Sequence, residues 1–90
     1  MTAKRGKPEI IFDILAAIQA IGGTIKPTRL LYKSNLSHER LKLYLENLTK
    51  QELVSVDADG DRKMITLTQK GYTFISEYRK MKELISSFGI

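Results

Sequence analysis

The stretch that decides the fold of this chain is NLSHERLKLYLENLTKQELV, residues 35–54. Asn35 tolerates the left-handed backbone of a tight interhelical turn, and Ser37 is a good N-cap because its hydroxyl accepts from a backbone N–H one turn on. Glu39 follows in the first turn, where the helix dipole favours an acid. The apolar residues then recur on one helical stripe, formed by Leu41, Tyr44, Leu45 and Leu48. The stretch therefore predicts the turn and second helix of a helix-turn-helix.

The N-terminal residues predict a basic arm followed by a helix. Residues 1–7 (MTAKRGK) are polar, basic and without periodicity, as expected of a mobile arm. Pro8 suits the first turn of a helix, and the Gly22-Gly23 pair would stop it. Between them, apolar residues recur at helical spacing, namely Ile10, Ile11, Ile14, Leu15, Ile18 and Ile21.

A short strand and a second helix are expected before the turn. Thr24-Ile25-Lys26 leans toward β structure and predicts a third, edge strand. Residues 27–34 then predict a short helix that starts at a proline and buries Leu30 and Leu31. Tyr32 and Tyr44 are expected to lie in or beside the core.

The residues after the helix-turn-helix predict a β-hairpin and a long last helix. Residues 53–57 and 63–67 are β-rich, and the Asp-Gly pair within residues 58–61 favours a tight turn between them. Thr68 can cap a final helix that runs to about Ser87. The order helix, strand, helix, helix, hairpin, helix is that of a winged helix-turn-helix, an α+β fold that is mostly α.

The last helix carries more apolar surface than a lid over the core needs. Its apolar residues step by four, three, four and three in a coiled-coil pattern: Phe74, Tyr78, Met81, Ile85 and Phe88. Burying Met81, Ile85 and Phe88 is worth on the order of 2 kcal/mol each, which favours pairing with a second copy. The alternative is that the helix folds back over its own core. We expect a homodimer, and divide the chain into an arm (1–7), a winged helix-turn-helix domain (8–70) and a dimerisation helix (71–90).

The composition narrows the functional classes. Fifteen basic and ten acidic residues give a net charge of +5, which suits a polyanionic partner. The chain has no cysteine, no signal-peptide pattern and no membrane-length apolar run, so we expect a cytoplasmic protein without a membrane partner. With a single histidine, we expect no enzyme activity, cofactor or metal site.

Three segments resemble the small archaeal winged-helix DNA-binding proteins of the "ten-a" chromatin type. They are KPEIIFDIL (7–15), KPTRLLYKSNLS (26–37) and LTQKGY (67–72). The resemblance implies a dimer through an antiparallel coiled coil of the last helices, and binding of duplex DNA with weak sequence preference. A nucleoid-associated location would follow. Archaeal regulators share these segments, so both chromatin packaging and transcription regulation remain open, and the last helix ends earlier than is usual in the family.

The charge distribution selects the candidate DNA contacts. Residues 1–34 carry six basic and two acidic side chains, whereas residues 35–52 carry three of each. Basic arms and helix N-termini bind phosphates, and exposed residues of the second helix of a helix-turn-helix reach base edges. The residues expected to contact DNA are Lys4, Arg5, Lys7, Lys26, Thr28, Arg29, Lys33, Ser37, His38, Arg40, Lys42, Arg62 and Lys63. Leu43 is either a contact to a thymine methyl or simply an exposed leucine.

Two weaker signals and a rival function remain. Asp57, Asp59 and Asp61 alternate like the start of a calcium loop, but the glycine falls one place early and Thr68 stands where that loop needs Glu. Three aspartates also make the hairpin a minor DNA contact. The alternative function is that of a winged helix that binds another protein instead of DNA. It would use the helix within residues 35–52, whose net charge is zero, and the acidic hairpin. His38 is expected to be a surface or phosphate-contacting residue because it lacks catalytic partners.

Overall fold

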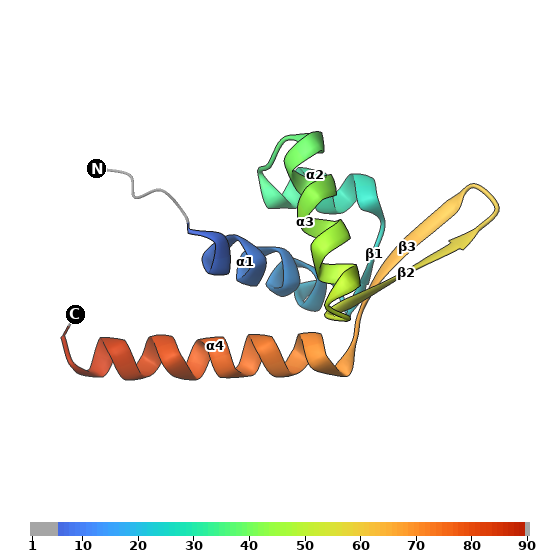
Figure 1. Ribbon diagram of the computed structural model, residues 1–90. Helices are drawn as coiled ribbons and strands as arrows, with labels where there is room; N and C mark the ends of the chain where they lie inside the picture. The colour runs from blue at the N-terminus through green and yellow to red at the C-terminus, as the bar shows by residue number, and fades with distance from the viewer. Residues whose placement is uncertain (1–5, 90) are drawn as a thin grey trace.

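The computed structural model describes residues 6–89 and has the predicted order of elements (Figure 1). The elements are α1 (Lys7–Ala20), β1 (Thr24–Ile25), α2 (Pro27–Ser34), α3 (His38–Lys50), β2 (Val54–Asp59), β3 (Arg62–Leu67) and α4 (Gln69–Ser87). This is a winged helix-turn-helix, mostly helical, with a long C-terminal helix. Lys7, assigned to the arm from the sequence, is the first residue of α1, and residues 1–5 lie outside the described residues.

Local hydrogen bonds set the helix boundaries at the predicted places. The hydroxyl of Ser37 accepts from the backbone N–H of Arg40 at 3.2 Å, and that of Thr68 accepts from Gly71 N–H at 3.1 Å. Asn35 has a left-handed backbone with φ of 58°, which lets α2 and α3 meet at a sharp turn. Gly23 lies in the turn that follows α1 and has a φ of 100°, a conformation that suits glycine. A side chain at this position would collide with the hydroxyl of Tyr72.

The sheet is antiparallel with strand order β1-β3-β2. Thr24 pairs with Thr66, and their hydroxyl oxygens lie 3.2 Å apart. The β2–β3 hairpin is longer than predicted, because Asp59 still pairs with Arg62 and only two residues form the turn. Gly60 has φ of 63°, a conformation that suits glycine and allows so tight a connection.

The core forms where α1 meets the other elements. Its buried apolar side chains are Ile10, Ile14, Leu15, Ile18, Ile25, Leu30, Leu41, Leu48, Val54, Ile65, Leu67 and Ile75. Tyr44 is half-buried against this core, as expected. The prediction for Tyr32 was wrong, because its side chain is 91% exposed. The buried face of α2 carries Leu30 and Ser34, and a helical step of 100° per residue turns Tyr32 to the opposite face.

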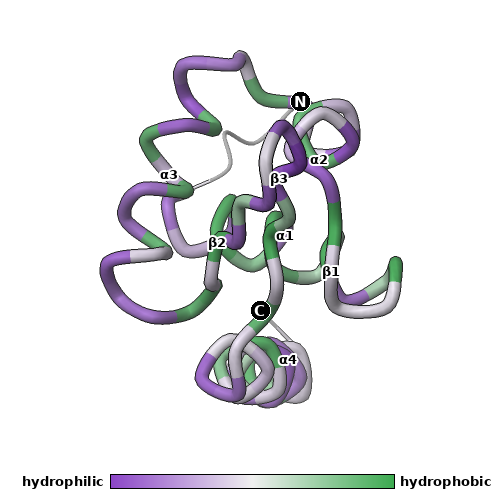
Figure 2. The backbone as a smooth tube through the Cα atoms, turned by 90° about the vertical axis from the view of Figure 1, so that its right-hand side faces the viewer, coloured by the Kyte–Doolittle hydropathy of each residue, from purple (hydrophilic) through white to green (hydrophobic). Residues whose placement is uncertain are grey.

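The two halves of α4 have different surroundings. Figures 1 and 2 show α4 beside α1 on the side away from the hairpin, running antiparallel to it and on past its N-terminal end. In the first half, Ile75 is buried, and the ring of Tyr78 stacks on that of Phe12 with centroids 4.7 Å apart. Phe74 stacks on Tyr78 in turn. In the second half, four apolar side chains are exposed, namely Met81, Leu84, Ile85 and Phe88. We call these four residues the α4 tip.

The fold thus answers part of the question that the sequence left open. Phe74 and Tyr78, expected at a dimer interface, pack within their own chain, so the first half of α4 does fold back over α1. The α4 tip has no such cover within residues 6–89. No helix within these residues combines the length and apolar character that a membrane-spanning segment needs.

Candidate nucleic-acid interface

Helix α3 is held by one face and exposes the rest. Leu41 and Leu48, two turns apart, are buried and fix the rotation of the helix. At 100° per residue, the opposite side is a crest carrying Glu39, Leu43 and Glu46, all exposed. The Leu43 side chain is 66% exposed, so it is available to a partner. The crest that would face the floor of a DNA groove is therefore acidic and apolar, with Lys50 at its end.

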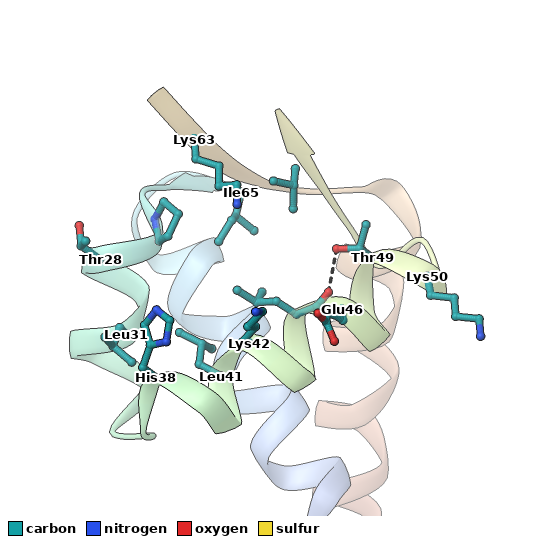
Figure 3. A pocket seen from close by; sticks show the side chains of 13 residues that line it. Thr28, Leu31, His38, Leu41, Lys42, Glu46, Thr49, Lys50, Lys63 and Ile65 are labelled. Carbon is teal, nitrogen blue, oxygen red and sulfur yellow. Dashed lines mark hydrogen bonds between the residues drawn. The ribbon is translucent and has the colours of Figure 1, made fainter. Parts of the chain in front are cut away.

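One flank of α3 borders a groove that we call the α3–wing groove. It has a volume of about 720 Å³ and lies between α2, α3 and the β2–β3 hairpin, the wing (Figure 3). Its lining residues are Pro27, Thr28, Leu31, His38, Leu41, Lys42, Leu45, Glu46, Thr49, Lys50, Val56, Lys63 and Ile65. The groove brings together four of the predicted DNA contacts, Thr28, His38, Lys42 and Lys63, from three different elements.

The other flank of α3 borders a smaller hollow next to the start of α1. This hollow of about 280 Å³ is lined by Lys7, Arg40, Leu43, Tyr44 and Asn47. It brings Lys7 and Arg40 together, although they are far apart in the sequence. As a result, α3 has basic side chains on both flanks: Lys42 with Lys63 on one, and Arg40 with Lys7 on the other. Phosphates on either side of an inserted helix would meet these cations.

The remaining predicted contacts lie outside the two hollows. Lys26 is the N-cap residue of α2, and Arg29 and Lys33 are exposed on the same helix. Arg62 is exposed next to the hairpin turn. Ser37 is committed to capping α3, since its hydroxyl already accepts from Arg40 N–H. Lys4 and Arg5 lie outside the described residues.

Two features of this surface were missed from the sequence. The first is the apolar floor of the α3–wing groove, where Val56 and Ile65 are direct cross-strand partners beside Leu31 and Leu45. The weak alternation of apolar and polar residues in 53–57 was a sequence signal for one apolar face of this strand. The second is the exposed Tyr32, for which the helical position relative to Leu30 was the available signal.

Within residues 6–89, no group of three or more acidic or histidine side chains is arranged to hold a metal ion.

Comparison with known proteins identifies the family to which the fold belongs. The family model for winged helix-turn-helix proteins matches residues 4–86. The chain belongs to the winged helix-turn-helix family. A comparison with curated protein sequences gives no match.

Among solved structures, this winged helix-turn-helix chain is similar to Sso10a-2, a DNA-binding protein from Sulfolobus solfataricus. The two are 30% identical over 94% of this chain and 90% of that one, with a TM-score of 0.76. AF1382 from Archaeoglobus fulgidus shares the fold at 17% identity, covering 89% of this chain and 90% of that one, with a TM-score of 0.71. These findings confirm the resemblance to archaeal winged-helix DNA-binding proteins.

A mutant MarR from E. coli, solved in complex with operator DNA, shares the fold at 18% identity with a TM-score of 0.67. That match covers 74% of this chain and 49% of the MarR chain, so the matched part spans about half the length of MarR. The likeness shows that the two chains share the winged-helix fold.

Proposed function

We propose that this protein is a homodimer that binds duplex DNA with weak sequence preference, organising chromatin or controlling transcription. The observation that carries the proposal is the pair of basic flanks on either side of α3. A B-DNA major groove is about 12 Å wide and admits one helix, so a helix within it has a phosphate backbone on each side. Lys42 and Lys63 would meet one backbone, and Lys7 and Arg40 the other.

The acidic crest of α3 supports weak sequence preference. Strong readout of guanine uses Arg or Lys pointing straight at the base edge, whereas here the basic residues flank the helix. Glu39 and Glu46 would instead face the bases, where a carboxylate can accept only from an amino group such as that of cytosine. Affinity would come mainly from phosphates, as it does in binding that is largely independent of sequence.

The α4 tip supports the homodimer. An isolated stripe of four exposed apolar side chains on a helix end is unfavourable in water, and a second copy offers an identical stripe. By resemblance to the archaeal family, the two α4 helices would run antiparallel. Such a dimer holds two DNA-binding faces at a fixed separation, which allows it to bridge duplexes or to span two half-sites.

Titration of a fluorescent random-sequence duplex across a salt series, followed by anisotropy, tests the proposal. We expect binding at low salt that weakens steeply as salt rises, because each neutralised phosphate contributes about −0.9 to the slope of log K against log salt. A preference of about 10³ or more for one sequence would favour a specific regulator over a packaging protein. Absence of binding at about 50 mM salt would contradict binding to random DNA.

The rival function is a winged helix that binds a protein through the crest of α3. The acidic and apolar character of Glu39, Leu43 and Glu46 is the observation that favours it. A variant that neutralises five basic residues distinguishes the two: Lys4, Arg5, Lys7, Arg29 and Arg40. DNA binding would be abolished in that variant, whereas a protein partner would still be bound.

A further inference from the structure

We propose that the α3–wing groove is a binding site for a small amphipathic anion, an organic carboxylate or sulfonate with an aromatic or branched apolar body. The groove volume of about 720 Å³ falls in the range of about 300–1,000 Å³ found for small-molecule sites. Three elements that are separate in the sequence build it, so the site depends on the fold and not on one helix face.

The floor of the groove selects an apolar body. Leu31, Leu45 and Val56 are partly exposed there, above the buried side chains of Leu41 and Ile65. All five of these side chains are aliphatic, so the floor itself presents no polar group for a ligand to satisfy. A bare inorganic ion would leave this apolar surface in water, whereas a hydrocarbon or aromatic body would cover it.

The rim of the groove selects a negative charge. Lys42 on α3 and Lys63 on β3 border it from two elements, and Lys50 extends from its far end (Figure 3). Glu46 is the only acid among the lining residues, so three lysines stand against one glutamate. None of the three lysines makes a salt bridge within residues 6–89. A ligand anion would therefore gain cations that no carboxylate of the described chain has neutralised.

Occupation of the groove would oppose DNA binding. Lys42 and Lys63 border the groove and are also proposed phosphate contacts, so a ligand anion and a DNA backbone would compete for the same two cations. Thr28 and His38 are further residues that both partners would share. This consequence rests on the proposed function, whereas the ligand site itself does not. The protein would then release DNA in response to the ligand.

The test uses two dyes that differ in charge. 8-Anilinonaphthalene-1-sulfonate is an amphipathic anion whose fluorescence rises in apolar sites, and N-phenyl-1-naphthylamine is its uncharged counterpart. We expect the full-length protein to bind the anion more tightly than the neutral dye. The double variant Lys42→Gln/Lys63→Gln should lose about tenfold in affinity for the anion and little for the neutral dye. Lys80→Gln/Lys82→Gln, which removes two exposed positive charges from α4, is the matched control and should change neither affinity.

Location is tested separately, because the α4 tip is a second apolar surface that can attract a dye. Val56 is 36% exposed and lies on a strand, so Val56→Trp can fill the groove without disturbing the core. We expect this variant to keep its thermal midpoint of unfolding and to lose at least tenfold in affinity for the anion. In NMR spectra of the unsubstituted protein, we expect the anion to shift the amide signals of Leu31, Lys42 and Leu45. Unchanged affinity in Val56→Trp, or shifts confined to α4, would overturn the proposal, as would equal affinity for both dyes.

Competition then separates this site from the proposed function. If the protein binds DNA, the anion should displace it, with a displacement constant equal to the anion's own dissociation constant. If the protein binds the anion in the groove but no DNA at low salt, the ligand site stands and the proposed function fails. If DNA and the anion bind together without mutual effect, the shared-cation model is wrong.

Discussion

The α3–wing groove and the α4 tip are both apolar and both open to solvent, but they suit different partners. The groove is concave, is built from three elements and is bordered by Lys42 and Lys63. The α4 tip is convex, belongs to one helix, and lies among charges of both signs such as Lys82 and Glu83. A concave cationic surface fits an anion, whereas a convex neutral stripe is best covered by a second copy of itself.

The comparison shows that exposed apolar area alone does not identify a partner. In both places leucine side chains reach solvent, and a hydropathy plot would treat the two surfaces alike. The difference lies in curvature and in the sign of the surrounding charge. Tyr78 marks the boundary, because its ring stacks on Phe12 and ties the first half of α4 to the domain that carries the groove.

The largest expected effect comes from a charge placed on the α4 tip. Ile85→Glu should make the protein monomeric, because the carboxylate would be buried without a partner in the dimer. DNA affinity should then fall by about 100-fold, since the two faces would no longer bind as one bivalent unit. Sedimentation equilibrium and anisotropy measure the two effects. Ser86→Glu adds the same charge off the stripe and should change neither, and a dimeric Ile85→Glu protein would show that the tip is not the interface.

The next effect concerns the half of α4 that folds back. Tyr78→Ala should lower the free energy of unfolding by about 2 kcal/mol, since it removes a half-buried ring stacked on Phe12. Urea denaturation measures this, best in an Ile85→Glu background so that dissociation does not contribute. Tyr32→Ala is the matched control, and its side chain is so exposed that we expect a change within about 0.5 kcal/mol. Equal losses in the two variants would show that α4 is not anchored at Tyr78.

The same contrast explains what could be predicted from the sequence. Local signals fixed the elements, because Asn35, Ser37 and Thr68 act through their own backbone neighbours. The candidate contacts on both flanks of α3 followed from charge and helical spacing. The α3–wing groove did not follow, because it needs the hairpin to return alongside α3, which depends on packing between distant residues. Tyr32 was misplaced for a similar reason, since contact with the core at Leu30 sets the rotation of α2.

A smaller effect is expected when the cations of the groove are removed. Lys42→Gln/Lys63→Gln should weaken binding to a random duplex by about tenfold at low salt and reduce the salt slope by about 2, because two phosphate contacts are lost. Lys80→Gln, remote from the groove, should leave both values unchanged. A loss of affinity with an unchanged salt slope would indicate that these lysines hold the shape of the site and do not contact phosphates.

The smallest expected effect has the opposite sign and tests the crest between the two flanks. Glu46→Gln should tighten DNA binding by about threefold at low salt, because in the proposed complex the carboxylate would lie within a Debye length of the phosphates that Lys42 and Lys63 contact. The gain should shrink as salt rises, and Glu83→Gln, an exposed acid on α4, should show no gain. Weaker binding in Glu46→Gln would mean that the carboxylate accepts from a base, most naturally the cytosine amino group. The acidic crest would then read sequence, and the preference of the protein for DNA would be more specific than its basic flanks indicate.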